Sequence, residues 1–228
     1  MPTRYFTPKL FAFLRELEEN NDRSWFKANQ DAYEEFVREP ALEFINDFAQ
    51  PLQKISPHFS ADSRKSGGSL FRIQRDTRFS KDKTPYKTNS GMHFRHASAK
   101  NAHAPGFYLH LEPSGCFMGV GLWRPESKVA YAIRAHIDED QTGWKKATRS
   151  KRFTDVYSLG GDSLVRAPRG YDEDHPLIGD LKRKDFMAST RLTQKQITSD
   201  RLMADFTDNC KRAAPLVSFL CGAVDVPF

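Results

Sequence analysis

The first quarter of the chain shows a helical spacing of apolar residues. Thr7 followed by Pro8 is typical of a helix start, because threonine can cap free backbone N–H groups and proline needs no hydrogen-bond partner at the first helical position. Apolar residues then recur every three or four positions over 8–20 and 24–38, and the pattern restarts at Pro40. The expected inward positions are Phe11, Leu14, Leu17, Trp25, Phe26, Tyr33, Val37, Leu42, Ile45, Phe48 and Leu52.

The middle of the chain changes to an alternating pattern, which is typical of strands. Predicted strands cover 69–79, 88–96, 106–112, 116–123 and 185–192, and the short turn Pro113-Ser114-Gly115 makes a hairpin of the third and fourth. Helices are predicted from Pro125, near 177–182 and over most of 193–223, with a glycine-rich break at 159–161. The sequence therefore predicts an α+β fold with a helical N-terminal region, a central and mainly antiparallel sheet, and a helical C-terminus.

Composition and cysteine usage narrow the class of protein. With 39% hydrophobic residues, 18 of them Phe, the chain of 228 residues can bury a sizeable core, and no linker divides it, so we expect one domain over 1–228. Three cysteines without CxxC spacing argue against a disulfide framework. Because the chain also lacks a long apolar run and a leader pattern, we expect a cytoplasmic protein with no membrane partner.

The charge of the chain is concentrated in the segment RIQRDTRFSKDKTPYK, residues 72–87. Six basic and two acidic residues give this segment a charge of +4, out of +6 for the whole chain. If 70–79 is extended, Arg75 shares a face with Phe71 and Ile73, and an arginine on an apolar face needs a carboxylate partner. We therefore interpret Arg75 as structural.

The opposite face of the same segment is suited to anions. Asp76 can orient the guanidinium of Arg78 for bidentate contact with a phosphate or carboxylate. The predicted ligand-binding residues of this segment are Arg72, Arg78, Lys81, Lys83 and Lys87. Asp76 is thus both a structural residue and, with Asp82 and Tyr86, a candidate acid or base.

The same segment carries a family resemblance. Together with NNDRSWFKANQDAY upstream, and with GFYLHLEPSGCFMGVGLWRP and PRGYDEDHP downstream, it resembles the bacterial and fungal family known as domain of unknown function 2461. The resemblance covers nearly the whole chain and shows no departure along Arg75-Asp76, Arg78-Phe79-Ser80, Asp82-Lys83 or Pro85-Tyr86-Lys87. It implies a single domain and brings no activity, cofactor or catalytic residue.

The predicted hairpin adds a second candidate site. One face is apolar, and the other carries Tyr108, His110 and Glu112 beside Phe117, Gly119, Gly121 and Trp123. Two glycines on one face leave room for a ligand above them, and we include Tyr108, Gly119 and Gly121 among the candidate ligand-binding residues. The alternative is that a helix packs on the glycines and that His110 pairs with Glu112. His110 is a further candidate acid or base.

The remaining histidines do not predict a metal site. His93, His96 and His103 have no ligand spacing, and His175 lies in an acidic turn. No nucleotide-binding, nucleophile-elbow or metalloprotease pattern occurs, and the cofactor is unknown from the sequence.

Three functions fit these patterns, and the sequence does not indicate an oligomeric state. The first is a pocket for a small phosphate- or carboxylate-bearing molecule, with or without catalysis. The second is nucleic-acid binding, in which Phe71, Phe79 and Tyr86 stack on bases between the basic residues. The third is a non-catalytic interaction domain in which the ions of 72–87 form an internal scaffold.

Overall fold

The N-terminal region is helical in the computed structural model, which describes residues 3–97 and 105–228. Asp22 caps the second helix by accepting hydrogen bonds from the backbone N–H groups of Ser24 and Trp25. A π-helical turn joins the third helix to the fourth, whose first turn contains Pro40. The elements are α1 Pro8–Glu19, α2 Arg23–Ala28, α3 Gln30–Tyr33, η1 Glu34–Arg38 and α4 Glu39–Ile55.

A six-stranded antiparallel sheet forms the centre, in the order β1-β2-β3-β4-β6-β5. Its strands are β1 Phe59–Ser60, β2 Ser90–His96, β3 Gly106–Leu111, β4 Cys116–Leu122, β5 Ser158–Gly160 and β6 Phe186–Leu192. The predicted hairpin is β3–β4, and the predicted strands before and after it are β2 and β6. The glycine-rich stretch that was expected to be a break forms the short edge strand β5 instead.

The remaining helices lie between and after the strands. They are α5 Ser127–Glu139, α6 Gln141–Arg149, α7 Lys151–Thr154, α8 Ile178–Leu181, α9 Gln194–Ile197 and α10 Leu202–Ala223. Helix α10 packs against α4, α5, α6, α7 and β4. The α+β class, with helical ends around an antiparallel sheet, is confirmed.

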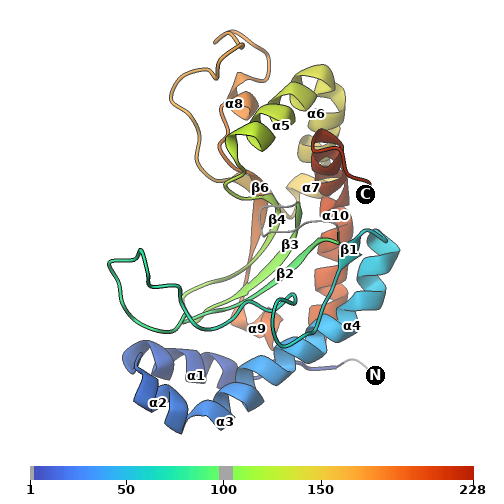
Figure 1. Ribbon diagram of the computed structural model, residues 1–228. Helices are drawn as coiled ribbons and strands as arrows, with labels where there is room; N and C mark the ends of the chain where they lie inside the picture. The colour runs from blue at the N-terminus through green and yellow to red at the C-terminus, as the bar shows by residue number, and fades with distance from the viewer. Residues whose placement is uncertain (1–2, 98–104) are drawn as a thin grey trace.

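The two faces of the sheet differ in burial. The alternating apolar residues of β3 and β4 are fully buried on the side of α4 and α10 (Figure 1). There Phe48 of α4, Phe94 of β2 and Phe206 of α10 form a ring cluster with centroid separations of 4.7 to 5.8 Å. The opposite face carries side chains that are only half-buried, among them Tyr108 and His110.

The predicted strand at 69–79 is wrong. Leu70 and Gln74 form only isolated bridges, to Met92 and Tyr86. The backbone changes partners along the segment, because the N–H of Phe71 donates to Gly91 whereas that of Arg75 donates to Pro85. Hydrogen bonds between side chains and nearby backbone groups then favour turns over pairing with a neighbouring strand. As a result the expected apolar face does not exist: Ile73 is buried, Phe71 is 37% exposed and Phe79 is 94% exposed.

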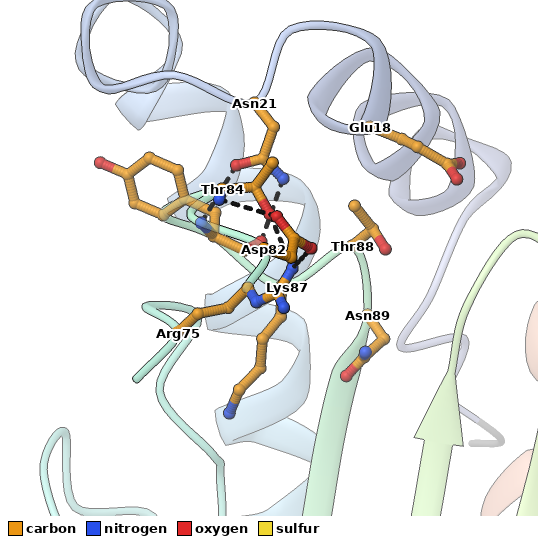
Figure 2. Close-up of a pocket in the computed structure, with 9 residues that line it drawn as sticks. Glu18, Asn21, Arg75, Asp82, Thr84, Lys87, Thr88 and Asn89 are labelled. Atoms are coloured by element: carbon orange, nitrogen blue, oxygen red, sulfur yellow. Dashed lines mark hydrogen bonds and ion pairs between the residues drawn. The ribbon is translucent and has the colours of Figure 1, made fainter. Parts of the chain in front are cut away.

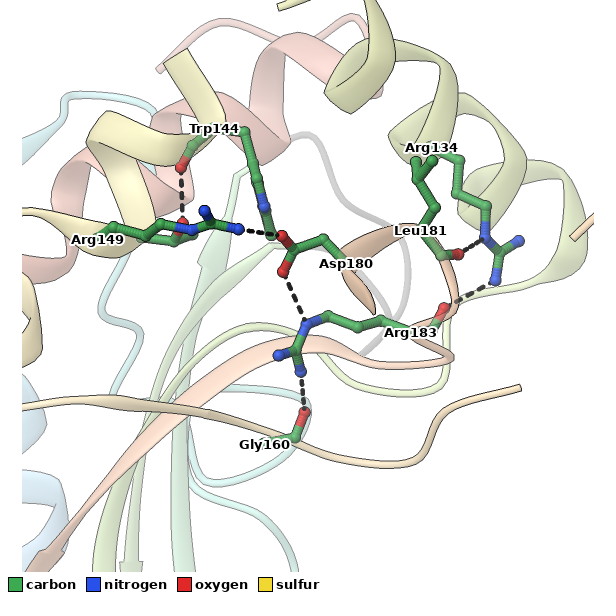
Figure 3. Close-up of polar contacts among 8 residues, drawn as sticks. Arg134, Trp144, Arg149, Gly160, Asp180, Leu181 and Arg183 are labelled. Carbon is green, nitrogen blue, oxygen red and sulfur yellow. Dashed lines mark hydrogen bonds and ion pairs between the residues drawn. The ribbon is translucent and has the colours of Figure 1, made fainter. Parts of the chain in front are cut away.

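An ion cluster around the buried carboxylate of Asp180 ties the α8 region to the sheet edge and to α6 (Figure 3). The carboxylate of Asp180, in α8, accepts a hydrogen bond from Arg149 at 2.8 Å and lies 3.4 Å from Nε of Arg183. Arg183 also donates to the carbonyl of Gly160 in β5. Arg134 of α5 donates to the carbonyls of Leu181 and Arg183 at 2.7 Å each. Charged groups, and not apolar packing alone, therefore fix this region.

The cysteines and the hydrophobic core complete the description of the fold. Cys116, Cys210 and Cys221 are free and buried, and burial raises the pKa of each thiol.

Within the ranges that the structure describes, every helix is too short or too polar to cross a bilayer. Buried residues from the N-terminal helices, the sheet and α10 belong to one continuous core, which favours the single-domain organisation that stays a prediction.

Candidate functional site

A surface pocket of about 310 Å³ lies between the end of α1 and the segment after Arg75 (Figure 2). Asn21 holds its two walls together, because its side-chain amide donates to the carbonyl of Tyr86 and accepts from the Tyr86 N–H, both at 3.0 Å. The ring of Tyr86 stacks on Phe26 of α2 at 4.1 Å. The pocket is lined by Glu18, Asn21, Arg75, Asp82, Thr84, Tyr86, Lys87, Thr88 and Asn89.

Arg75 is paired with a carboxylate, although the apolar face that led us to expect one does not exist. Its Nη1 donates to Asp82 and, at 2.6 Å, to the hydroxyl of Thr84. Asp82 in turn accepts from the backbone N–H and the hydroxyl of Thr84. These Thr84 bonds, followed by Arg75, lower the pKa of Asp82 to about 2. The side chain of Arg75 is 29% exposed, so it is half-buried, paired and part of the pocket wall at once.

Arg78 is paired with the residue expected to orient it. Its Nε and Nη2 donate to the two carboxylate oxygens of Asp76, at 2.9 and 2.7 Å. The side-chain bond to Arg78 is the main reason why the pKa of Asp76 is lowered to about 2. Both side chains are exposed, at 76% and 42%, and neither lines the pocket. The fork of Arg78 that was predicted to meet an anion is therefore occupied by Asp76.

Of the basic residues predicted to bind a ligand, Lys87 is the one that lines the pocket in Figure 2. Its ammonium donates to the carbonyl of Arg72 at 2.9 Å and lies 5.5 Å from the ring centre of Phe71. Burial, and after it the charge of Arg72, lowers the pKa of Lys87. Lys83 donates to the carbonyl of Thr77, away from the pocket.

The other predicted cations, Arg72 and Lys81, are exposed outside the pocket. Residues that the sequence did not single out complete the walls. Thr88 and Asn89 follow Lys87 directly, so their polar character next to a predicted anion site was a usable signal. Asn21 was not recognisable, since it contacts Tyr86 across 65 positions of sequence.

The half-buried face of the sheet carries a second polar cluster. The hydroxyl of Tyr108 lies 2.9 Å from Nδ1 of His110, and Nε2 of His110 lies 3.3 Å from a carboxylate oxygen of Glu112. The ring of Phe117, on β4, stacks on His110 at 4.6 Å. Burial, and after it Glu112, raises the pKa of Tyr108 to about 12. The pairing of His110 with Glu112 is the one named in the alternative interpretation of this face.

The two glycines of β4 do not leave the open depression that the sequence suggested. A Cβ at Gly119 would be in ordinary contact with the side chains of Phe117 and Tyr108, at 3.7 to 3.8 Å, so these side chains flank the glycine. A Cβ at Gly121 would lie 2.3 Å from the backbone carbonyl of Phe186 in β6. The neighbours are thus side chains of the same face at Gly119, and at Gly121 the next strand together with Leu220 of α10, at 3.3 Å. Tyr108, Gly119 and Gly121 lie outside the pocket of Figure 2.

Phe71 connects the two regions. Its ring lies 5.9 Å from that of Tyr108 and 6.0 Å from that of His93, and the ammonium of Lys87 lies 5.5 Å from its centre. The sheet face and the pocket wall are therefore joined through one exposed aromatic ring.

The described part of the chain contains no group of three or more histidine, cysteine or acidic side chains placed to hold a metal ion. His96 contacts the carbonyl of Pro227 and His175 pairs with Asp138, both at 3.0 Å. His103 lies outside the described residues.

His93 gives a pH dependence that can be measured. Burial, assisted by Arg95, lowers its pKa from 6.5 to about 4, so between these values the unfolded chain binds more protons than the folded one. We expect the free energy of unfolding to fall as pH drops from 6.5 to 4. Urea unfolding of His93→Gln across this range should show a smaller fall than the parent chain, and an unchanged slope would contradict the assignment.

Comparison with known proteins adds a family and no activity. No curated protein matches the chain. A family model described as "Conserved hypothetical protein (DUF2461)" matches residues 9–219, which include α1, the whole sheet, the pocket of Figure 2 and most of α10. The resemblance noted along 72–87 is thereby confirmed over most of the sequence, and the chain belongs to the DUF2461 family.

Proposed function

We propose that the chain binds a small phosphate- or carboxylate-bearing molecule in the pocket of Figure 2. The observation that carries this proposal is Lys87, a half-buried cation among the residues that line the pocket. A desolvated cation attracts an anion more strongly than a fully hydrated one. The ammonium also has three donors, of which the carbonyl of Arg72 uses one.

The rest of the pocket wall supports the same ligand class. Arg75 adds a guanidinium that its bonds to Asp82 and Thr84 hold in place, although Asp82, on the same wall, offsets its charge. The neutral side chains of Thr88 and Asn89 offer further donors. Glu18, on the wall formed by α1, carries the opposite charge, which favours a ligand with a hydroxyl or amino group at the end away from its anionic group.

Ligand binding should be visible as thermal stabilisation. A ligand at about 100 times its Kd stabilises a protein by about 2.7 kcal/mol, which raises the Tm of a chain of this size by roughly 5 to 10 °C. We expect such a shift with a member of a panel of inorganic phosphate, sugar phosphates, nucleotides and hydroxy or amino carboxylates. Lys87→Gln should weaken the affinity by about tenfold or more, since a hydrogen bond to a charged group contributes about 1.5 to 3 kcal/mol.

Lys83→Gln is the matched control for this experiment. It removes the same charge from the same segment, but Lys83 is exposed and points to the carbonyl of Thr77 outside the pocket. Equal loss of affinity in the two variants would indicate a diffuse effect of charge and would contradict the pocket. A panel without any stabilising compound would also contradict it.

A second function, single-stranded nucleic-acid binding, is favoured by Phe79. This ring is 94% exposed and lies 5.8 Å from the guanidinium of Arg78, an arrangement on which a base can stack. Of the other two rings proposed for stacking, Phe71 is partly covered and Tyr86 is stacked on Phe26. Oligonucleotide binding that weakens steeply between 50 and 200 mM salt would favour this function over the pocket.

A further inference from the structure

Three polar side chains form a hydrogen-bonded chain along β3 and the residue that follows it. Tyr108, His110 and Glu112 occupy alternate positions and therefore project from one face of the strand. An ionised carboxylate can only accept, so the Nε2 of His110 that faces Glu112 carries the hydrogen. The Nδ1 of the neutral ring is then an acceptor, and it can only take the hydrogen of the Tyr108 hydroxyl.

The surroundings hold this chain in place. Gly91 of β2 lies under the phenol, and a Cβ at this position would be 2.4 Å from the hydroxyl oxygen of Tyr108. Phe117 stacks on the imidazole from β4, and Phe71 lies 5.9 Å from the ring of Tyr108. The side chain of His110 is only 13% exposed, whereas that of Glu112 is 32% exposed. The positions of the phenol and the imidazole are therefore fixed by packing as well as by hydrogen bonds.

We propose that Tyr108 is a reactive hydroxyl on the half-buried face of the sheet, with His110 as its base and Glu112 as the positioning carboxylate. In the reaction the hydroxyl proton moves to Nδ1 of His110 as the phenol oxygen bonds to an electrophilic carbon, sulfur or phosphorus atom. The electrophile loses its leaving group with the bonding electron pair. Glu112 stabilises the imidazolium through the hydrogen on Nε2.

The phenol of Tyr108 is neutral before the reaction. Because burial and the charge of Glu112 raise the pKa of Tyr108, the proton stays on oxygen until an electrophile is present. This is the situation of a hydroxyl nucleophile with an adjacent base, in which proton transfer accompanies bond formation. The three residues lie outside the pocket of Figure 2, so this inference does not depend on the proposed anion site.

The test uses methanesulfonyl fluoride, a small neutral electrophile. Attack by the phenol oxygen forms an oxygen–sulfur bond and releases fluoride, and the proton on His110 passes to water. The intact folded chain is labelled and sampled over time. Peptide mass spectrometry of the samples then gives the labelling rate of each tyrosine. Tyr131, which is 64% exposed, serves as the internal reference. We expect Tyr108 to react about tenfold faster than Tyr131, although it is less exposed.

Variants separate an activated hydroxyl from a merely structural hydrogen bond. His110→Gln should lower the Tyr108 rate by about 100-fold and leave Tyr131 unchanged. Glu112→Gln should lower it less, and Glu112→Asp should restore part of the loss. Gly91→Ala, which displaces the phenol while His110 remains, should also lower the rate.

Two results would overturn the proposal. The first is a Tyr108 rate no higher than that of Tyr131, and the second is a Tyr108 rate that is unchanged in both His110→Gln and Glu112→Gln. Glu112 is partly exposed, so its variants should fold even if those at His110 do not, and circular dichroism identifies any variant that has lost the fold.

Discussion

Gly121→Ala is expected to lower the free energy of unfolding by about 3 kcal/mol, and with it the Tm by roughly 6 to 12 °C. Gly121 has a φ of +104°, a backbone conformation that other residues avoid. An added Cβ would also lie 2.3 Å from the carbonyl oxygen of Phe186, which belongs to the backbone and cannot rotate away. The β4–β6 pairing must therefore open locally, and urea denaturation followed by circular dichroism would measure the loss.

Gly119→Ala is the control in the same strand. Gly119 has no positive φ, and its added Cβ would meet only rings at 3.7 Å or more, which is ordinary contact. We expect the free energy of unfolding of this variant to lie within about 1 kcal/mol of that of the parent chain. Alanine lowers the conformational entropy of the unfolded chain, which offsets small packing changes in the folded one. Similar destabilisation by the two substitutions would show that the backbone conformation and close contact at Gly121 are not the cause.

Asp180→Asn is expected to cost about 3 kcal/mol of stability. The substitution keeps the shape of a buried side chain but removes the charge that offsets Arg183, whose side chain is only 19% exposed. A half-buried cation left without its counter-charge is costly, whereas the bonds of Arg134 to the same region remain. Chemical denaturation at neutral pH measures this loss.

Asp155→Asn provides the comparison for this second prediction. Asp155 pairs with Lys151 at 2.8 Å, the same distance as between Asp180 and Arg149. In this pair, however, both side chains are exposed, Asp155 at 47% and Lys151 at 87%. Exposed pairs contribute about 0.5 kcal/mol or less. A loss at Asp180 as small as the loss at Asp155 would mean that the cluster in Figure 3 is solvated and does not fix the region.

The elements predicted correctly were those whose pattern is set by burial within the element itself. The hairpin β3–β4 has a short turn and an uninterrupted alternation, and β6 pairs with β4 along its whole length. The segment 69–79 alternates in the same way, but its backbone partners are loop residues, and the turn made by Asp76 with Arg78 is a local bond. Alternation alone does not show whether a neighbouring strand exists.

The candidate site was predictable to a similar extent. The need of Arg75 for a carboxylate, and the pairing of Asp76 with Arg78, followed from charges two to seven positions apart. The pocket itself did not follow from the sequence, because Glu18 of α1 and Asn21, two residues after that helix, line it from a distant part of the chain. The chain Tyr108–His110–Glu112 could be placed on one face, but not its distances, which depend on Gly91 in another strand.

Helix α10 has a consequence for biosynthesis. It covers β4 and contacts α4, α5, α6 and α7, so elements made early share one late partner. During translation the sheet and the N-terminal helices emerge before residues 202–223, and their apolar surfaces stay in contact with water until that helix arrives. A ribosome that stalls within this last stretch would therefore hold a nascent chain with an open core, the kind of chain that chaperones bind.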